Sequence, residues 1–254
     1  VLCDGRWTMR DRELLTLDVE ELKRRAAKTA SRIDYFLTER EESVLSKLVA
    51  IGGVDRVETF EVQVKVHLDD SIPVEDVLEG EDAPVVRSSW RQQYDTYFLF
   101  GDVETSRLRY REDEILDEDG NVEDIVYRLT LIGETKEREF AQSILLSRSR
   151  FDAPAIHSRR FYREYFQPVD EVKIHKDRRR YHIRYGGTDF AINLDRVTKP
   201  DLPGVFLEIK SRTWSGEDAK RKAELMGKLL DLFDVEKEVV KQEYVELAAD
   251  EQEL

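Results

Sequence analysis

The chain has 254 residues, enough for one large domain or two small ones, and it carries 55 acidic residues against 41 basic ones. The net charge of -14 excludes a general nucleic-acid-binding protein, because such proteins need a surface excess of Lys and Arg. The single cysteine, Cys3, excludes an internal disulfide, and no apolar run approaches the ~20 residues that a membrane-spanning helix needs. We therefore expect a cytoplasmic protein with neither a membrane nor a nucleic-acid partner.

The charge is unevenly distributed along the chain. Acidic residues gather in 112–124 and 246–253, whereas the strand-like stretches 107–111 and 173–184 are basic. A basic interior within an acidic molecule indicates a small anionic ligand rather than a long one.

The first 33 residues have the pattern of a hairpin followed by a helix. Asp4 and Gly5 suit the positive φ angles of a tight turn, and Asp18 is placed to cap the helix. This stretch resembles the C-terminal tail of amidohydrolases that deaminate or dechlorinate guanine-like and triazine rings, although an ordinary hairpin and helix would have the same pattern. The resemblance implies a fused amidohydrolase domain upstream, and the first residue, Val1 rather than Met, also suggests a longer reading frame.

The helical pattern ends at Gly52 and Gly53, so we place a domain boundary there and expect an N-terminal segment, 1–53, and a second domain, 54–254. Beyond this pair, polar and apolar residues alternate with a period of two. Strands are expected at 60–68, 94–100, 107–111, 125–132, 144–151, 172–176, 180–185, 190–197 and 205–212, and helices at 154–166 and 215–233. Eight or nine strands with few helices favour the α+β class: a closed, eight-stranded antiparallel β-barrel with peripheral helices and an N-terminal hairpin-helix segment.

Several of these strands carry two or three charges on one face. The charged or polar sets are Glu61, Gln63 and Lys65; Arg107, Arg109 and Arg111; Arg148 and Arg150; and Glu208, Lys210 and Arg212. An open sheet would turn such faces to water, whereas closure would turn them inward, where charges must pair, stay hydrated or hold a ligand. Carboxylates bind hard cations, and Lys and Arg neutralise phosphate oxygens, so the pattern indicates a lumen for a polyphosphate.

The same strands resemble the CYTH, or triphosphate tunnel, metalloenzymes, which include thiamine triphosphatase, inorganic triphosphatases and the class IV adenylyl cyclases. The matching segments, in order, are Glu61-Val-Gln-Val-Lys65, Tyr94-Asp-Thr-Tyr-Phe98, Leu108-Arg-Tyr-Arg-Glu112, Tyr127-Arg-Leu-Thr-Leu131, Lys176-Asp-Arg178 with Tyr181, Asn193-Leu-Asp195-Arg-Val197 and Gly204-Val-Phe-Leu-Glu208-Ile-Lys210. The chain departs from the family pattern at Gln63 and Lys210, which replace carboxylates, at Ile132, which replaces a lysine, and at Arg148 and Arg150, which lie in a strand that is usually rich in Glu.

The resemblance implies a site for Mg²⁺ or Mn²⁺ and a triphosphate. The implied metal ligands are Glu61, Asp195 and Glu208. The implied catalytic, phosphate-gripping residues are Lys65, Arg107, Arg109, Lys176 and Arg178, with Arg111, Arg148, Arg150, Lys210 and Arg212 as further ligand-binding residues.

The expected function is therefore metal-dependent hydrolysis of inorganic triphosphate, thiamine triphosphate or a nucleoside triphosphate. An adenylyl cyclase is one alternative. A second is a polyphosphate-binding module without turnover, which regulates the fused domain and is suggested by Gln63 and Lys210. A purely structural appendage would have no anion affinity. The oligomeric state stays open, and a homodimer is one candidate.

Overall fold

The computed structural model describes residues 1–51, 60–78, 81, 83–101, 107–133, 145–146, 150–234 and 238–252. The expected boundary at Gly52 and Gly53, and Arg148 in the expected strand 144–151, lie outside these described residues. The chain divides into two compact units, Val1–Ile51 and Gly52–Leu254, and each is described by itself. Within the described ranges, no helix combines the length and the apolar character that crossing a membrane requires.

The first unit consists of short hairpins and two helices. Its elements are β1 (Leu2–Cys3), β2 (Arg6–Trp7), β3 (Met9–Arg10), β4 (Glu13–Leu14), α1 (Val19–Glu42) and α2 (Val44–Ala50). The hairpin predicted at Asp4 and Gly5 is confirmed, with φ angles of 50° and 75°. The predicted cap is also confirmed, because the Asp18 carboxylate accepts a hydrogen bond from the backbone N–H of Glu21 at 2.9 Å.

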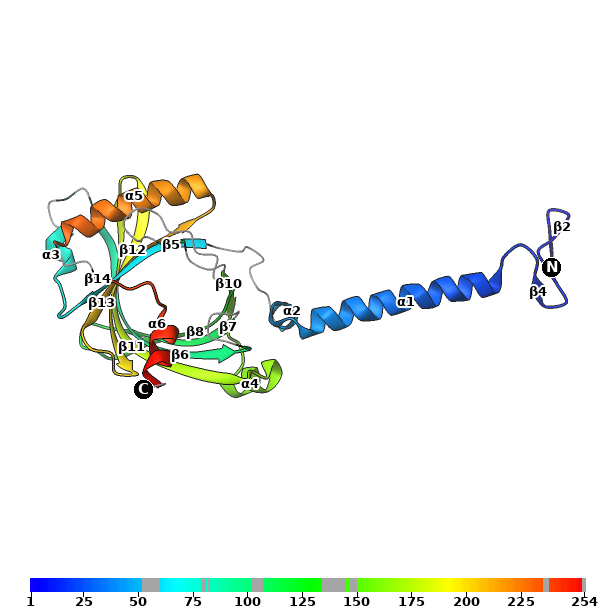
Figure 1. Cartoon of the computed structure of the whole chain (residues 1–254), viewed down its shortest axis with the longest axis horizontal. Helices are drawn as coiled ribbons and strands as arrows, with labels where there is room; N and C mark the ends of the chain where they lie inside the picture. The colour runs from blue at the N-terminus through cyan, green and yellow to red at the C-terminus, as the bar shows by residue number, and fades with distance from the viewer. Residues whose placement is uncertain are drawn as a thin grey trace. The chain divides into compact units, whose positions relative to one another are not determined.

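The second unit is built on one antiparallel sheet that curls into a half-barrel (Figure 1). Its strand order is β10-β8-β7-β6-β11-β12-β13-β5-β14, and β9 also pairs with β5. The strands are β5 (Phe60–Leu68), β6 (Val85–Leu99), β7 (Arg107–Leu116), β8 (Val122–Ile132), β9 (Leu145–Leu146), β10 (Arg150–Pro154), β11 (Asp170–Tyr185), β12 (Thr188–Lys199), β13 (Val205–Thr213) and β14 (Glu238–Val239). The predicted α+β class and the antiparallel sheet are confirmed.

The predicted closure of the barrel is wrong. Among the described residues, β10 pairs with β8 alone, and the other end of the sheet, β5, carries only the two-residue strands β9 and β14 besides β13. Closure requires a ladder between the two end strands, and such a ladder is set by sheet tilt and stagger rather than by side-chain alternation. The sheet is therefore an open, curled one with eight strands of five residues or more.

Two strands are longer than their sequence pattern indicated. β6 has 15 residues and β11 has 16, and β11 joins the two strands expected at 172–176 and 180–185. The acidic stretch 112–124 lies mostly in β7 and β8, and these strands are joined by a turn in which Asp117 accepts a hydrogen bond from the Asn121 N–H at 2.8 Å. Gly120 has a φ of 84°, a conformation that glycine adopts without strain. The long strands therefore carry charged side chains much further along the half-barrel than expected.

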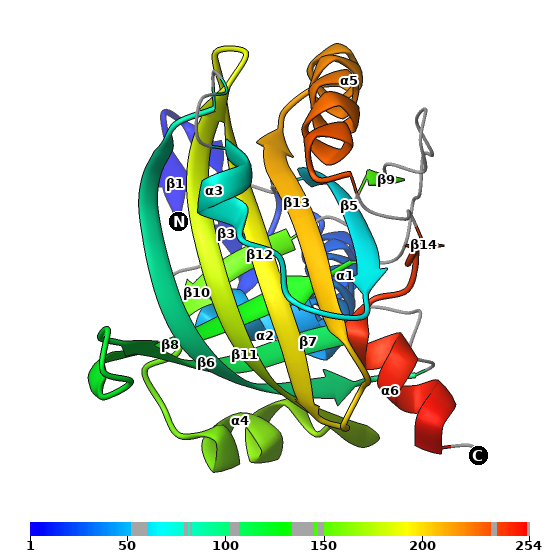
Figure 2. The ribbon, with the colours of Figure 1, turned by 90° about the vertical axis from the view of Figure 1, so that its left-hand side faces the viewer.

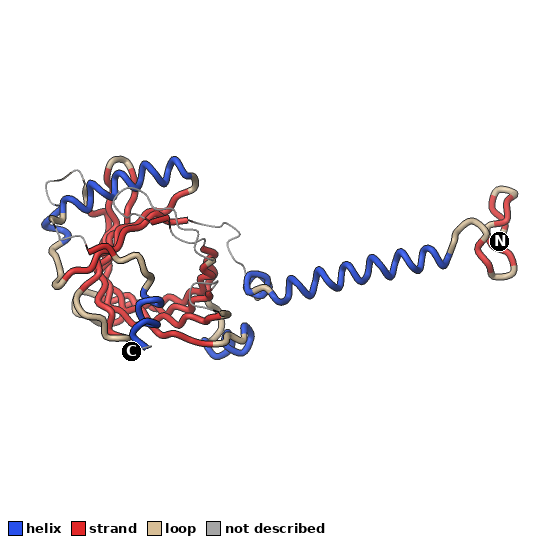
Figure 3. Tube along the Cα trace, in the orientation of Figure 1, coloured by secondary structure: helices blue, strands red, loops and turns tan. Residues whose placement is uncertain are grey.

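The described part of the second unit contains few helices, as the tube in Figure 3 shows. They are α3 (Val74–Leu78), α4 (Arg159–Phe166), α5 (Gly216–Leu232) and α6 (Tyr244–Gln252). The predicted helix after Ser215 is confirmed as α5, because the Ser215 hydroxyl accepts a hydrogen bond from the N–H of Asp218 at 3.2 Å.

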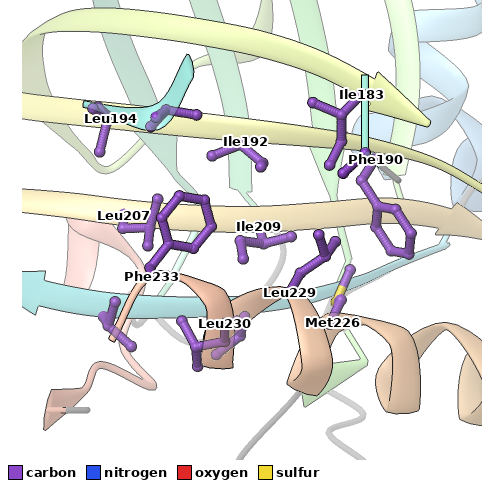
Figure 4. Close-up of a cluster of buried hydrophobic side chains, with 14 of the residues drawn as sticks. Ile183, Phe190, Ile192, Leu194, Leu207, Ile209, Met226, Leu229, Leu230 and Phe233 are labelled. Carbon is purple, nitrogen blue, oxygen red and sulfur yellow. The ribbon is translucent and has the colours of Figure 1, made fainter. Parts of the chain in front are cut away.

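One core lies between α5 and the convex face of the sheet (Figure 4). Leu207 and Ile209 of β13 and Met226, Leu229 and Leu230 of α5 are at most 1% exposed. Burying side chains of this size is the main favourable contribution to folding. It also fixes which face of β13 turns toward the concave side.

A second core lies at one end of the concave side, where α6 packs (Figure 2). Tyr244, Val245 and Ala248 of α6 are buried against apolar residues that include Ile174 and Phe206. The concave face therefore has an apolar end covered by α6, while charged side chains occupy the rest.

Candidate ligand-binding lumen

A cavity of about 610 Å³ lies on the concave side of the half-barrel, and we call it the lumen. Strand alternation contributes to it: Glu208, Lys210 and Arg212 of β13 line the lumen, whereas Leu207 and Ile209 belong to the core under α5. The volume falls within the ~300–1,000 Å³ of typical small-molecule pockets.

Basic side chains outnumber acidic ones around the lumen by eleven to six. The basic residues are Arg109, Arg111, Arg128, Arg150, Lys176, Arg178, Arg180, Lys210, Arg212, Arg221 and Lys222. The acidic residues are Glu61, Asp113, Asp152, Asp189, Glu208 and Glu243. The lumen is therefore cationic within a chain whose net charge is -14.

Most of the predicted site residues come together in this lumen. Those that line it are Glu61, Arg109, Arg111, Arg150, Lys176, Arg178, Glu208, Lys210 and Arg212. Lys65, Arg107 and Asp195 are buried and do not line it, and Arg148 lies outside the described residues.

Two buried arginines are each held by an aspartate. The Nε and Nη2 atoms of Arg111 donate to the two carboxylate oxygens of Asp95, each at 2.6 Å. Arg178 makes the same two-pronged contact with Asp195, and its Nε–Oδ1 distance is 2.5 Å. Burial would raise the pKa values of both carboxyls, but the facing guanidinium lowers each below its usual range. These pairs fix the arginine orientations.

Tyr244 of α6 reaches the lumen between charged groups. Its ring lies 4.1 Å from the ammonium of Lys65 and 4.7 Å from that of Lys176. Lys65 also donates to the carbonyl oxygen of Gln242 at 2.8 Å. Two of the predicted phosphate-gripping lysines are therefore in contact with the C-terminal segment.

Arg107 likewise contacts α6. It is fully buried, and its Nη1 lies 3.1 Å from the carboxylate of Glu246. Its neighbours in the ladder, Leu99 and Ile132, belong to the apolar core under α6. Arg107 is therefore placed at the apolar end, away from the lumen.

Four guanidinium groups that line the lumen form no ion pair with a carboxylate in the described part of the chain: Arg109, Arg128, Arg180 and Arg212. Arg109 donates to the hydroxyl of Thr130 at 3.0 Å, and its buried Nε has no hydrogen-bond partner among the described residues. Arg180 donates to the side-chain oxygen of Asn193 at 2.8 Å. Such groups retain donors and positive charge for an anion.

The clustering of these cations shifts their pKa values. Burial, followed by Arg178 and Arg111, lowers the pKa of Lys176 well below its usual value. The same causes lower the pKa of Arg180 to about 9. The pKa of Arg128 is also lowered, first by burial and then by neighbouring arginines. The charged forms of these three residues are therefore disfavoured, whereas, despite burial, nearby carboxylates raise the pKa values of Arg109, Arg150 and Arg178.

Two of the predicted metal ligands, Asp195 and Glu208, already accept hydrogen bonds from neighbouring side chains. Asp195 is occupied by Arg178 and by the hydroxyl of Tyr244, which donates to it at 2.7 Å. Glu208 accepts hydrogen bonds from Asn193 at 2.9 Å and from Arg178 at 3.2 Å. Within the described ranges, no three His, Cys, Asp or Glu side chains are grouped as ligands for one ion.

Glu61 differs from these two carboxylates. Its Oε2 atom is buried and accepts no hydrogen bond in the described part of the chain, although Arg150 Nη1 lies 3.5 Å away and Lys210 Nζ 3.8 Å away. Burial would raise the pKa of Glu61, but Lys210 and Arg150 lower it. Two cationic side chains therefore already face this oxygen.

Sequence reasoning missed several residues of the lumen. Arg180 continues the alternation of Lys176 and Arg178, and the expected break within β11 concealed it. Arg128 pairs with Arg111 in the β7–β8 ladder. It was missed because its predicted strand carries no second charge on the same face. Glu243 lies in the C-terminal segment directly before α6. No sequence pattern indicated that this segment packs on the concave face.

No protein-family model matches the chain, and no curated protein matches its sequence. Among solved structures, the PH1819 protein from Pyrococcus horikoshii OT3 is similar, with a TM-score of 0.57 and 20% identity over 75% of this chain and 99% of that one. A "putative adenylate cyclase" from Vibrio parahaemolyticus has a TM-score of 0.48 and 15% identity over 76% and 99% of the two chains. The Mimivirus capping enzyme triphosphatase has a TM-score of 0.41 and 12% identity over 72% and 91%. This chain therefore shares its fold with PH1819, while membership of the triphosphate tunnel family and the amidohydrolase-like tail stay predictions.

Proposed function

We propose that the lumen binds a compact polyanion of the triphosphate class. The observation that carries this proposal is the set of four guanidinium groups, Arg109, Arg128, Arg180 and Arg212, that face one cavity without a carboxylate partner in the described residues. Guanidinium groups form two-pronged, charge-assisted hydrogen bonds with phosphate oxygens. A chain of linked phosphates offers several such oxygens within a small volume.

The electrostatics of the lumen support an anion of high charge. Lys176 and Arg180 have lowered pKa values because burial and neighbouring cations disfavour their charged forms. A bound polyanion would offset that repulsion and raise both pKa values, so binding and protonation of these two groups favour each other. A single monovalent anion cannot satisfy several guanidinium groups at once.

The predicted Mg²⁺ or Mn²⁺ does not fit the predicted ligands as they are placed. Glu208 and Asp195 already accept from Arg178 at 3.2 Å and 2.5 Å, and Oε2 of Glu61 lies 3.5 Å from Arg150 and 3.8 Å from Lys210. Binding without turnover is therefore the function that the geometry supports best, and it corresponds to the binding-module alternative.

Hydrolysis of a triphosphate is the second candidate, because the buried Glu61 Oε2 atom has no hydrogen-bond donor in the described residues. An adenylyl cyclase would use the same lumen. Incubation with tripolyphosphate and with ATP, in Mg²⁺ or Mn²⁺, separates these activities by release of phosphate, pyrophosphate or cyclic AMP. Glu61→Ala and Glu208→Ala are the matched controls, and activity that both variants retain would contradict the site assignment.

Calorimetric titration with tripolyphosphate, in EDTA, tests the binding proposal directly. Arg109→Ala should weaken binding by roughly 1.5–3 kcal/mol, the usual contribution of a hydrogen bond to a charged group. Arg196→Ala removes the same charge from an exposed position of β12 and should leave the affinity unchanged. Absence of tripolyphosphate binding, or an equal loss in both variants, would contradict the proposal.

A further inference from the structure

Lys210 lies between the two carboxylates that line the lumen on adjacent strands. Its ammonium nitrogen is 3.5 Å from Oε2 of Glu208 and 3.8 Å from Oε2 of Glu61. Glu208 precedes Lys210 by two residues on β13, and Glu61 lies on the paired strand β5. One cation therefore bridges both carboxylates.

The backbone holds Lys210 in this place. The preceding residue, Ile209, points to the opposite face of β13 and is fully buried in the core under α5. Lys210 pairs with Gln63 on β5 and Ala191 on β12, so it occupies a central strand and cannot turn outward without breaking the ladder. The Lys210 side chain therefore projects into the lumen.

The charges around the two carboxylates leave no negative excess for a divalent ion. Arg150 Nη1 lies 3.5 Å from Glu61, and Arg178 Nη2 lies 3.2 Å from Glu208. Together with Lys210, three cations face two carboxylates. Mg²⁺ requires closely packed oxygen ligands at ~2.0–2.1 Å and loses its water shell reluctantly, so it competes poorly with an ammonium fixed between the same oxygens.

We propose that Lys210 is a built-in counter-ion that takes the place of a divalent metal, so that the lumen binds its polyanion without one. The ligand part of this proposal rests on the proposed function, whereas the metal part does not. Lys210 is thus a specificity-determining residue. It orders the two carboxylates and selects a polyphosphate that arrives free of Mg²⁺ rather than as a metal complex.

The test measures binding of Mn²⁺ alone by the loss of the electron paramagnetic resonance signal of the hydrated ion. Wild-type protein should bind no stoichiometric Mn²⁺. Lys210→Glu supplies a third carboxylate and should bind one Mn²⁺ at least about tenfold more tightly than wild type. Lys220→Glu makes the same charge change at an exposed position of α5 and should behave as wild type.

Lys210→Met is a second variant, in case Lys210→Glu fails to fold. It removes the positive charge while keeping a side chain of similar length. It should also bind Mn²⁺ more tightly than wild type, by a smaller factor than Lys210→Glu. Stoichiometric Mn²⁺ binding by wild type, or equal Mn²⁺ affinity in wild type and both Lys210 variants, would overturn the proposal.

The ligand part is tested by titrating wild-type protein with tripolyphosphate in EDTA and again with Mg²⁺ in excess. Binding in EDTA that is as tight as, or tighter than, binding with Mg²⁺ supports the proposal, and binding that needs Mg²⁺ overturns it. If tripolyphosphate binds under neither condition, the proposed function fails, while the Mn²⁺ measurement still decides the role of Lys210.

Discussion

The hydroxyl of Tyr244 donates a hydrogen bond to Oδ2 of Asp195 across 2.7 Å, and this contact joins α6 to strand β12. Asp195 also receives two N–H donors from Arg178, so three donors meet one buried carboxylate. Burial, followed by Asp195 and Glu208, raises the pKa of Tyr244 well above its usual value. The phenol therefore stays protonated and keeps its role as a donor.

Removal of this hydroxyl should destabilise the second unit. Tyr244→Phe keeps the ring but deletes a hydrogen bond to a buried, charged acceptor, and the expected loss in unfolding free energy is about 1–3 kcal/mol. Urea denaturation measures it. Tyr185→Phe is the matched control, because Tyr185 forms no side-chain hydrogen bond in the described part of the chain. Equal effects of the two substitutions would argue against the contact.

Asp95 should be more important for stability than exposed aspartates. Asp95→Asn leaves Arg111 as a buried charge without its partner, and breaking such a pair costs roughly 3–5 kcal/mol. Asp119→Asn, in the exposed turn between β7 and β8, should change the stability by less than about 0.5 kcal/mol. The double variant Asp95→Asn with Arg111→Met should recover part of the loss. No recovery would mean that Asp95 acts through contacts other than Arg111.

Acid should remove the stabilisation that Glu243 provides. Burial would raise its pKa, but Arg150 and Arg107 lower it from 4.5 to about 2. A carboxyl with a depressed folded-state pKa stabilises the protein fully above its unfolded pKa, and this effect fades as the pH falls toward the folded value. The stability difference between wild type and Glu243→Gln should therefore be present at neutral pH and shrink between about pH 4.5 and 2. A difference that is constant across this window would contradict the assignment.

Alkaline pH should weaken polyanion binding through Arg180. Because its pKa in the free protein is lowered to about 9, binding above that pH must first restore the proton. The affinity for tripolyphosphate should therefore fall as the pH rises through about 9. The ligand itself gains negative charge with pH, so its own titration has the opposite effect. Arg180→Ala should bind more weakly at neutral pH and show a smaller fall; an identical pH profile would exclude Arg180 from the ligand contacts.

Much of the fold follows from alternation in the sequence. The valines of β5 and the isoleucine and leucine of β13 point to α5, which fixes Glu61, Lys65 and Glu208 on the concave face. In a strand with this period of two, the sequence alone determines which side chains share a face, whether the sheet is open or closed. This is why so many of the predicted site residues meet in one lumen.

Closure of the sheet and the position of α6 depend on contacts between segments far apart in the sequence, which a local pattern cannot predict. Whether the sheet closes depends on the distance between β10 and β5 after eight strands of twist, not on any one strand. The place of α6 depends on three apolar side chains, Tyr244, Val245 and Ala248, too few to distinguish a packed helix from a frayed one. The sequence therefore showed only an acidic stretch at 246–253, whereas the structure places Glu243 beside Arg150 and Glu246 beside Arg107.

Because side chains alternate along β13, this one strand contributes both to a hydrophobic core and to the lumen. Odd positions such as Leu207 and Ile209 serve the core under α5, and even positions such as Glu208 and Lys210 serve the lumen. An insertion or deletion of one residue would exchange the two sets of side chains. Charged side chains would then enter the hydrophobic core, and apolar side chains would line the lumen. Evolution or engineering can therefore retune ligand selectivity here only by replacing even-numbered side chains, with the length of the strand held fixed.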